Sequence, residues 1–238
     1  MNWWEMEPFY NDAATSDIKK GSIVFTPVLF MDPTRLVLSV ERNSVDINTH
    51  DGGNFTIEKL DYDKHFRQQA ITLPVYKIGL RINEELLVNK AKMRPCVVLS
   101  MEAENIERPT ENDKAVPALN KQSLFLLPLY GFDKGTTDIP KYSPIMRNRI
   151  MCLQYNKLFF FPKDIEGRNS VTKDSFGRLD MCFNAPRSYV KATGREVSDI
   201  YMDLLDLYLA SYFHMETPDE MYTNSKVLLE LAQSQVPE

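Results

Sequence analysis

The sequence predicts a mainly β fold with a helical C-terminus, and two patterns support this prediction. Short apolar runs rich in β-branched and aromatic residues recur between residues 22 and 161, separated by polar segments with glycine and proline. From residue 197 the apolar residues follow the period of an amphipathic helix. The chain has 238 residues, 43% hydrophobic and 26% charged, so it is long enough to bury a core without disulfides.

The predicted strands are apolar runs bounded by turn residues. In chain order they are 22–30, 36–40, 44–48, 55–60, 71–82, 96–99, 124–130, 149–153 and 157–161, the last two forming one strand or two. Segments 44–48 and 55–60 alternate apolar and polar residues around Asp51-Gly52-Gly53, which predicts a β-hairpin between them. The first 20 residues lack periodicity and predict an arm, and residues 102–122 predict a long polar loop.

The C-terminal segment predicts two helices. Apolar residues at helical spacing run from Val197 to Tyr212, with three aspartates on another face. Thr217-Pro218-Asp219-Glu220 has the residues of a capping box and predicts a second helix that continues through 227–231. Residues 186–238 are therefore expected to form an acidic helical pair packed on a strand-rich body.

The charge is unevenly distributed along the chain. From Arg195 to the end there are two basic and nine acidic residues, which leaves 26 basic and 24 acidic residues before it. A weakly basic body with an acidic tail is compatible with a polyanionic ligand. A solvated acidic helix face is the simpler explanation of the tail, and charge patterning favours it.

Several classes of protein are excluded by what the sequence lacks. The three cysteines, Cys96, Cys152 and Cys182, have neither disulfide-framework nor zinc-site spacing, and two of them lie in apolar runs typical of buried residues. There is no glycine-rich phosphate loop and no Gly-x-Ser-x-Gly motif. No stretch has the length of a membrane span, and the N-terminus does not read as a secretory signal, so a cytoplasmic location is expected.

Three residues near position 60 offer one possible metal site. Asp61, Asp63 and His65 would share one face of an extended strand. A solvated loop is favoured instead, because the three residues lack a distinctive ligand motif. No metal or other cofactor is predicted.

Arg94 is the most informative candidate for a functional residue. Pro95 favours extended geometry at Arg94, which places a guanidinium at the start of a buried strand, where it can bind a phosphate. Lys92 lies beside it, and tyrosines such as Tyr130 and Tyr142 alternate with the basic segments. That combination is typical of sites for single-stranded RNA. From spacing alone, an arginine in a surface ion pair is the more common case.

Four segments resemble the PemK/MazF toxin family in residues and in order. The family has a strand that opens Gly-(Asp/Ser)-Ile-Val, a strand that begins Arg-Pro and ends in Ser, an apolar strand with a proline, and a segment like Cys-Asp-Gln. The corresponding segments here are 21–24 (Gly-Ser-Ile-Val), 92–100 (Lys-Met-Arg-Pro-Cys-Val-Val-Leu-Ser), 126–131 (Leu-Leu-Pro-Leu-Tyr-Gly) and 152–158 (Cys-Leu-Gln-Tyr-Asn-Lys-Leu). The resemblance covers residues 18–165 in patches, and its Arg-Pro segment is the most specific.

The resemblance implies both a fold and an activity. Members of the family are SH3-like small β-barrels, usually dimeric, and cut single-stranded RNA without metal by attack of the 2′-hydroxyl on the adjacent phosphate. It implies such a barrel over residues 1–185, with inserted hairpins at about 31–90. The implied partners are single-stranded RNA, an antitoxin protein and a second copy of the chain in a homodimer.

The resemblance also implies the site residues. Arg94 matches the family arginine, which would stabilise the pentacoordinate phosphate and protonate the leaving oxygen. Tyr130 stands where many members have a catalytic threonine, and Leu153 stands where some have an aspartate. Arg94 and Tyr130 are the expected catalytic residues. The residues expected to bind RNA are Lys92, Ser100, Arg147, Arg149 and Gln154.

Three hypotheses follow. The chain is a toxin-like endoribonuclease, or it is a non-catalytic barrel that binds RNA or a protein partner, as the departures at Tyr130 and Leu153 would allow. The third hypothesis is that the acidic C-terminal helices cover the basic groove of the same chain, although acidic helix faces are common for solubility alone.

Overall fold

The computed structural model describes residues 2–30, 34–42, 53–61, 63, 65, 86–101, 122–133, 139–166, 170–216 and 223–235. The chain divides into two compact units. The first joins Met1–Pro27 to Met93–Glu238, and the second is Val28–Lys92. The insertion predicted at about 31–90 lies within the second unit.

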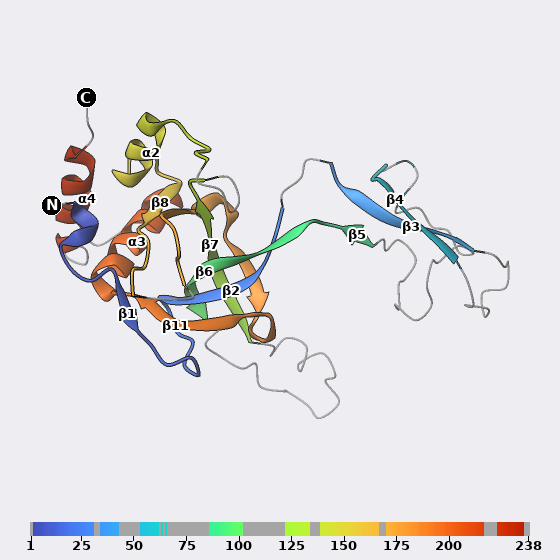
Figure 1. Cartoon of the computed structure of the whole chain (residues 1–238), viewed down its shortest axis with the longest axis horizontal. Coiled ribbons are helices and arrows are strands. Elements are labelled where there is room, and N and C mark those ends of the chain that lie inside the picture. Colours follow the sequence, from blue (N-terminus) through green and yellow to red (C-terminus); the bar gives the residue numbers. More distant parts are fainter. Residues whose placement is uncertain are drawn as a thin grey trace. The chain divides into compact units, whose positions relative to one another are not determined.

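An antiparallel β-sheet forms the centre of the first unit (Figure 1). Its strand order is β1-β11-β2-β6-β7-β9-β8, an open path over the described strands, and β10 also pairs with β7. The strands are β1 (Tyr10–Asp12), β2 (Ser22–Leu29), β6 (Ala91–Met101), β7 (Ser123–Gly131), β8 (Leu158–Phe161), β9 (Ser175–Arg178), β10 (Phe183–Pro186) and β11 (Lys191–Val197). The prediction of a mainly β fold is confirmed at this level.

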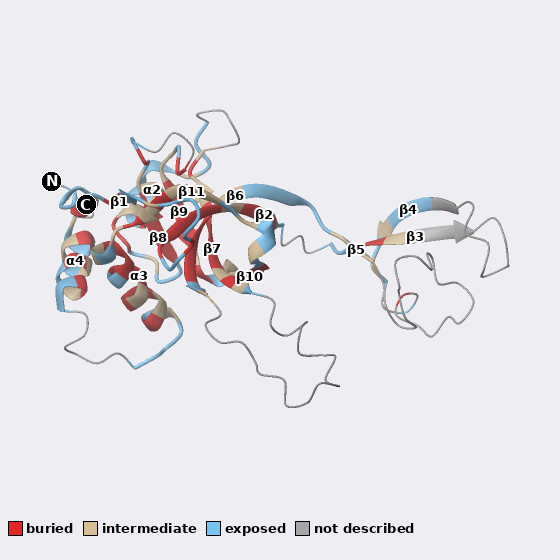
Figure 2. Ribbon diagram, turned by 90° about the horizontal axis from the view of Figure 1, so that it is seen from below, coloured by how far each residue is buried: buried red, intermediate tan, exposed pale blue. Residues whose placement is uncertain are grey.

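The buried strands coincide with the apolar runs of the sequence. All four residues of β8 are buried, as are Cys96 to Leu99 in β6 and Leu126 to Leu129 in β7 (Figure 2). Continuous burial on both faces of these strands explains why their sequences lack a polar alternation. Six of the predicted strands match observed ones, namely 22–30, 36–40, 55–60, 96–99, 124–130 and 157–161.

The strand predicted at 149–153 is wrong, because the helix α2 (Pro144–Met151) occupies most of this segment. Ser143 is the N-cap, and its side chain accepts a hydrogen bond from the Met146 amide. Pro144 occupies the first helical turn, where its missing N–H costs nothing. The Ser-Pro pair was the sequence signal for this helix, and it places Arg147 and Arg149 on a helix rather than in a strand.

The N-terminal segment packs into the core and is not an arm. Trp3, in the 3₁₀ turn η1 (Trp3–Glu5), is fully buried, and its Nε1 donates to the Met151 carbonyl at 2.8 Å. Its ring also meets those of Trp4, Phe9, Phe159, Phe160 and Tyr201 edge-on. The prediction failed because these apolar residues, though separated by polar ones without a regular period, converge in the folded chain.

The two C-terminal helices are present, as predicted. α3 (Asp199–Tyr212) and α4 (Thr223–Ser234) lie side by side, and Tyr201, Leu204 and Leu205 of α3 are buried in the core (Figure 1). The predicted capping box falls on residues 217–220, outside the described residues. Residues 186–238 also contribute β11, which pairs with β1 and β2 and was not predicted.

The second unit contains a small three-stranded sheet. Its order is β4 (Gly53–Lys59), β3 (Leu36–Arg42) and β5 (Leu87–Val88). β4 pairs with β3 along its whole length, from Leu36 opposite Lys59 to Arg42 opposite Gly53. Segments 44–48, 71–82 and 102–121 lie outside the described residues, and so do the predictions made for them.

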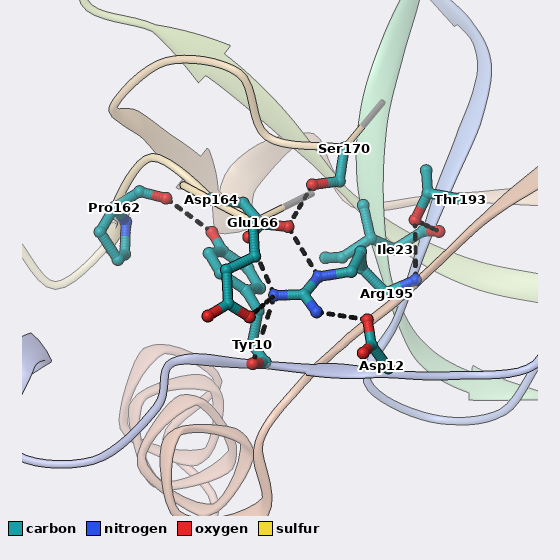
Figure 3. A network of polar contacts seen from close by, with 9 residues as sticks. All are labelled: Tyr10, Asp12, Ile23, Pro162, Asp164, Glu166, Ser170, Thr193 and Arg195. Atoms are coloured by element: carbon teal, nitrogen blue, oxygen red, sulfur yellow. Dashed lines mark hydrogen bonds and ion pairs between the residues drawn. The ribbon is translucent and has the colours of Figure 1, made fainter. Parts of the chain in front are cut away.

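A buried ion pair ties β11 to the rest of the first unit (Figure 3). The Arg195 guanidinium donates to both carboxylate oxygens of Asp164 at 2.9 Å, and both side chains are buried. The guanidinium also reaches the Asp12 carboxylate at 2.6 Å and the Tyr10 carbonyl at 3.5 Å, both in β1. The Arg195 guanidinium therefore joins strand β1, strand β11 and the segment after β8. The Ser170 hydroxyl donates a further hydrogen bond to the Asp164 carboxylate.

Candidate nucleic-acid interface

Arg94 and Tyr130, the two expected catalytic residues, lie against each other. In the β6–β7 ladder Cys96 is opposite Pro128, and the same antiparallel register carried two residues further sets Arg94 beside Tyr130 on one face. The Arg94 Cζ lies 4.5 Å from the centroid of the Tyr130 ring. Both residues are half-buried, so this cation–π contact is partly shielded from water.

Arg178 brings a second guanidinium to the same tyrosine. Its Cζ lies 5.9 Å from the Tyr130 ring centroid. Asp180 holds it with two hydrogen bonds, from Nε at 3.0 Å and from Nη2 at 2.6 Å. The hydrogen bond from Arg178 lowers the pKa of the Asp180 carboxyl, so this carboxylate stays ionised and fixes the fork of Arg178.

A row of aromatic rings continues from Tyr130 to a third arginine. Tyr130 stacks on Phe176 at 6.1 Å between centroids, and Phe176 contacts Phe132 at 5.2 Å and Tyr142 at 5.6 Å. Arg147 lies over the Phe132 ring at 5.2 Å and pairs with Asp174 at 2.8 Å. We call Arg94, Tyr130, Tyr142, Arg147 and Arg178 the arginine–tyrosine surface.

The hydroxyl of Tyr130 is held in its protonated form. Burial raises its pKa, and this effect exceeds the opposing pull of Arg94 and Arg178. At neutral pH the hydroxyl is therefore a hydrogen-bond donor as well as an acceptor, and it cannot act as a general base. Both phenols, those of Tyr130 and Tyr142, interact electrostatically with Arg178.

The other residues expected to bind RNA are distributed differently. Lys92 is exposed and lies two residues before Arg94 on β6, so the alternation of the strand puts both on one side. Ser100 is placed otherwise, because a bulge after Val98 pairs it with Phe125. Phe125 and Tyr130 point to opposite faces of β7 by alternation, so Ser100 does not share the face of Arg94.

Arg149 and Gln154 do not belong to the arginine–tyrosine surface. Arg149 is exposed on α2, and two residues apart on a helix it does not face the same way as Arg147. Gln154 lies after α2, and its Nε2 donates to the Gln233 carbonyl in α4 at 3.2 Å. Gln154, which resembles the family pattern, therefore contacts α4 and not the arginine–tyrosine surface.

The sequence did not predict that Arg178, Asp180 and Phe176 lie at this surface. Phe176 and Arg178 alternate around Gly177 in a strand of four residues, which is too short to stand out. A Cβ at Gly177 would come within 2.7 Å of the Leu127 side chain, so close packing of β9 on β7 explains the glycine. The sequence pattern that could have identified this pair is Arg178-x-Asp180, but oppositely charged residues two positions apart are common in surface loops.

The remaining candidate features of the sequence are the possible metal ligands and the cysteines. Among the described residues, no group of three or more His, Cys, Asp and Glu side chains could hold a metal ion. His65 is buried rather than solvated, and its Nδ1 lies 2.8 Å from the Asp61 carbonyl, while its Nε2 lies 3.3 Å from the Glu58 carboxylate. All three cysteines are free, and Cys96 and Cys152 are buried as expected. None of the described helices is both long and apolar enough to cross a membrane.

Comparison with known protein families and with curated proteins finds no match to this chain.

Proposed function

We propose that this chain binds single-stranded RNA on the arginine–tyrosine surface and cleaves it without a metal ion. The observation that supports the proposal is the contact between Arg94 and Tyr130, 4.5 Å from guanidinium carbon to ring centroid. In this proposal the sheet of the first unit is a divergent SH3-like barrel of the PemK/MazF kind, and residues 28–92 are its insertion.

The chemistry of the surface suits this ligand. Half-buried tyrosine rings can stack with bases, and arginine forks pair with phosphates through two parallel hydrogen bonds. Arg178 and Arg147 are already oriented by Asp180 and Asp174, so binding would immobilise little more of these side chains. The carboxylates also reduce the local positive charge, so a single strand with its bases turned toward the rings fits better than a bare polyanion.

Cleavage would proceed by an internal displacement at phosphorus. The 2′-oxygen forms a bond to phosphorus, the bond from phosphorus to the 5′-oxygen breaks, and a 2′,3′-cyclic phosphate and a free 5′-hydroxyl result. Arg94, with its single positive charge, would offset part of the negative charge of the pentacoordinate phosphate. The protonated Tyr130 hydroxyl would donate its proton to the leaving 5′-oxygen, and water would accept the proton of the 2′-hydroxyl.

A non-catalytic RNA-binding protein is the second candidate function. It is favoured by Tyr130, because a phenol whose pKa is raised is a weak acid. It is also favoured by Gln154, which follows α2 and donates a hydrogen bond to the Gln233 carbonyl of α4. The same surface would then bind RNA without a displacement step. The two functions differ in one measurable property, the appearance of cyclic-phosphate ends.

The deciding experiment incubates purified protein with an unstructured, end-labelled RNA in the presence of EDTA. The expected result is fragments that end in 2′,3′-cyclic phosphate, with cleavage reduced by roughly 10²-fold or more in the Arg94→Ala variant. Lys191→Ala is the matched control, because Lys191 is an exposed cation on β11 outside the surface.

Binding is measured in parallel by fluorescence anisotropy with the same RNA. Intact RNA together with Arg94-dependent binding would establish the second candidate. Absence of binding as well as cleavage would overturn both. Induction of the active protein in bacteria should arrest growth, and Arg94→Ala should relieve the arrest.

A further inference from the structure

A cavity lies in the first unit between the N-terminal segment and the segment that follows β8. Its volume is about 530 Å³, in the range of sites that enclose a small organic ligand. Arg195 of β11 forms part of its wall, together with its ion-pair partner Asp164. The five residues of the arginine–tyrosine surface do not line this cavity, so it is a separate candidate site.

Aromatic and aliphatic side chains form the apolar part of the lining. Trp4, Phe9 and Tyr10 contribute rings, and Ile165 contributes an aliphatic side chain that is 90% exposed. Trp4 is half-buried, so part of its indole is accessible to a ligand. An apolar ligand body would lose water-exposed surface against these groups, and an indole ring also attracts a cation over its face.

Contacts among the wall residues hold the rings in place. The Phe9 ring stacks on Tyr201 of α3, with centroids 4.3 Å apart and planes 18° from parallel. The Tyr10 hydroxyl donates to the Pro162 carbonyl at 2.8 Å, which joins β1 to the segment after β8. The Trp4 ring meets a phenylalanine ring of β8 edge-on at 4.8 Å. A ligand would therefore meet a preformed site, and little conformational entropy would be lost on binding.

Carboxylates outnumber cations in the lining, which has a formal net charge of −2 at neutral pH. The carboxylates are those of Glu5, Asp164, Glu166 and Asp174, and the cations are Lys163 and Arg195. The Arg195 guanidinium is paired with Asp164 at 2.9 Å and with Asp12 at 2.6 Å. Lys163 is exposed, so solvent and salt screen its charge. The charge of the cavity therefore favours a positively charged ligand over an anion.

Glu5 and Glu166 are the carboxylates best suited to bind a ligand, because Asp164 is held by Arg195 and Asp174 by an arginine of α2. Glu166 is 82% exposed, and its Oε2 lies 3.7 Å from Arg195 Nη2 (Figure 3). Glu5 accepts a hydrogen bond from the backbone amide three residues earlier, which lowers the pKa of its carboxyl and keeps it ionised. A carboxylate has about four acceptor positions, so one such contact leaves capacity for another.

We propose that this cavity binds a small organic ammonium, a molecule with an apolar body and a positively charged nitrogen. The body would pack against Trp4 and Ile165, and the nitrogen would donate charge-assisted hydrogen bonds to the carboxylates of Glu5 and Glu166. The proposal is independent of RNA binding, because the side chains it uses lie outside the arginine–tyrosine surface.

The test titrates 2-phenylethylammonium into isotope-labelled full-length protein and follows the indole N–H signals of the two tryptophans by NMR. The Trp4 signal, assigned with the Trp4→Phe variant, should shift with saturation and a dissociation constant on the order of 1 mM for a ligand of this size. The Trp3 signal should move less, because this side chain is fully buried and its Nε1 donates to the Met151 carbonyl.

Two comparison probes separate the charge of the ligand from its apolar body. The neutral 2-phenylethanol should bind about tenfold more weakly, because it cannot form charge-assisted hydrogen bonds. The anionic 3-phenylpropionate should leave the Trp4 signal unchanged, because the lining carries net negative charge.

The matched variants each remove two carboxylates. Glu5→Gln combined with Glu166→Gln should weaken binding of 2-phenylethylammonium by about fivefold, as expected for exposed charge pairs. Glu216→Gln combined with Glu230→Gln removes two exposed carboxylates at the C-terminal helices and should leave the affinity unaltered. A Trp4 signal that does not move up to about 10 mM probe would overturn the proposal. So would equal affinity for the ammonium and the alcohol, or equal affinity in the parent and the first double variant.

Discussion

Arg94 lies over the ring of Tyr130, with its Cζ 4.5 Å from the ring centroid, and the two residues come from neighbouring strands of one antiparallel ladder. The contact involves the face of the ring, while the hydroxyl is a separate group with its own electrostatic interactions. The stacking role and the proton-donating role of Tyr130 can therefore be separated by substitution.

Tyr130→Phe and Tyr130→Ala should differ in their effect on RNA. The phenylalanine keeps the ring, so RNA affinity should stay within about twofold of the parent, while alanine should lose about 1–3 kcal/mol of binding free energy. If the hydroxyl donates a proton, cleavage should fall in both variants. Anisotropy and cleavage assays measure the two effects. Tyr189→Ala, which removes an exposed tyrosine after β10, is the control. Unchanged cleavage by Tyr130→Phe would remove the proposed acid.

The Arg178–Asp180 pair should make stability depend on pH in a defined direction. The pKa of Asp180 is lowered in the folded state, chiefly by its hydrogen bond with Arg178. A lowered folded pKa gives stability that is present above the unfolded pKa of about 3.9 and is lost as pH falls through the folded value.

Asp180→Asn should therefore cost less than about 1 kcal/mol at neutral pH, because the pair is only partly buried. The difference between parent and variant should shrink below about pH 4. Urea unfolding across this pH range measures it. A difference that grows on acidification would contradict the assignment.

The sequence predicted those parts of the fold that depend on local pattern. The buried runs in β6, β7 and β8 have strand-like composition over several residues, and α3 has a clear apolar stripe. Prediction from local pattern failed where the structure depends on contacts between residues that are far apart in the chain. Trp3 is buried against rings from two distant parts of the chain, Phe159–Phe160 and Tyr201, and β9 packs closely on β7 at Gly177.

The same distinction holds for the site. Arg94 was found because Arg-Pro before an apolar run is a local signal, whereas Arg178 depends on a strand pairing that no local pattern revealed. The bulge after Val98 could not be predicted either, and it separates Ser100 from the face of Arg94.

Trp3 and Trp4 provide a paired test of the N-terminal contribution to the core. Trp3→Ala removes a fully buried indole and should lower the free energy of unfolding by about 3–5 kcal/mol. Trp4 is only half-buried, so Trp4→Ala should cost clearly less. Chemical denaturation followed by far-UV circular dichroism measures both. Equal and small losses would mean that the N-terminal segment does not belong to the cooperative core.

Cys96 should resist alkylation in the folded protein. Burial raises the pKa of its thiol to about 12, so almost no thiolate forms at neutral or mildly alkaline pH. Iodoacetamide should label it slowly between about pH 7 and pH 9, and rapidly once urea exposes a thiol with a pKa near 8.5. Mass spectrometry of the labelled peptides measures the difference. Rapid native labelling would show that β6 opens readily.

Arg195 and Asp164 form a buried pair whose loss should be asymmetric (Figure 3). Arg195→Met or Asp164→Leu alone leaves one buried charge without its main partner and should destabilise the fold by about 3–5 kcal/mol. The double variant removes both charges and should be less destabilised than the sum of the two single variants.

Asp12→Asn is the control for this cycle, because the Asp12 carboxylate is 93% exposed and should contribute at most about 1 kcal/mol. Urea denaturation of the four proteins gives the coupling energy between Arg195 and Asp164. If the effects of the two single variants simply add, the pair acts through packing alone. Strand β11 would then be held by its hydrogen bonds to β1 and β2 rather than by the guanidinium.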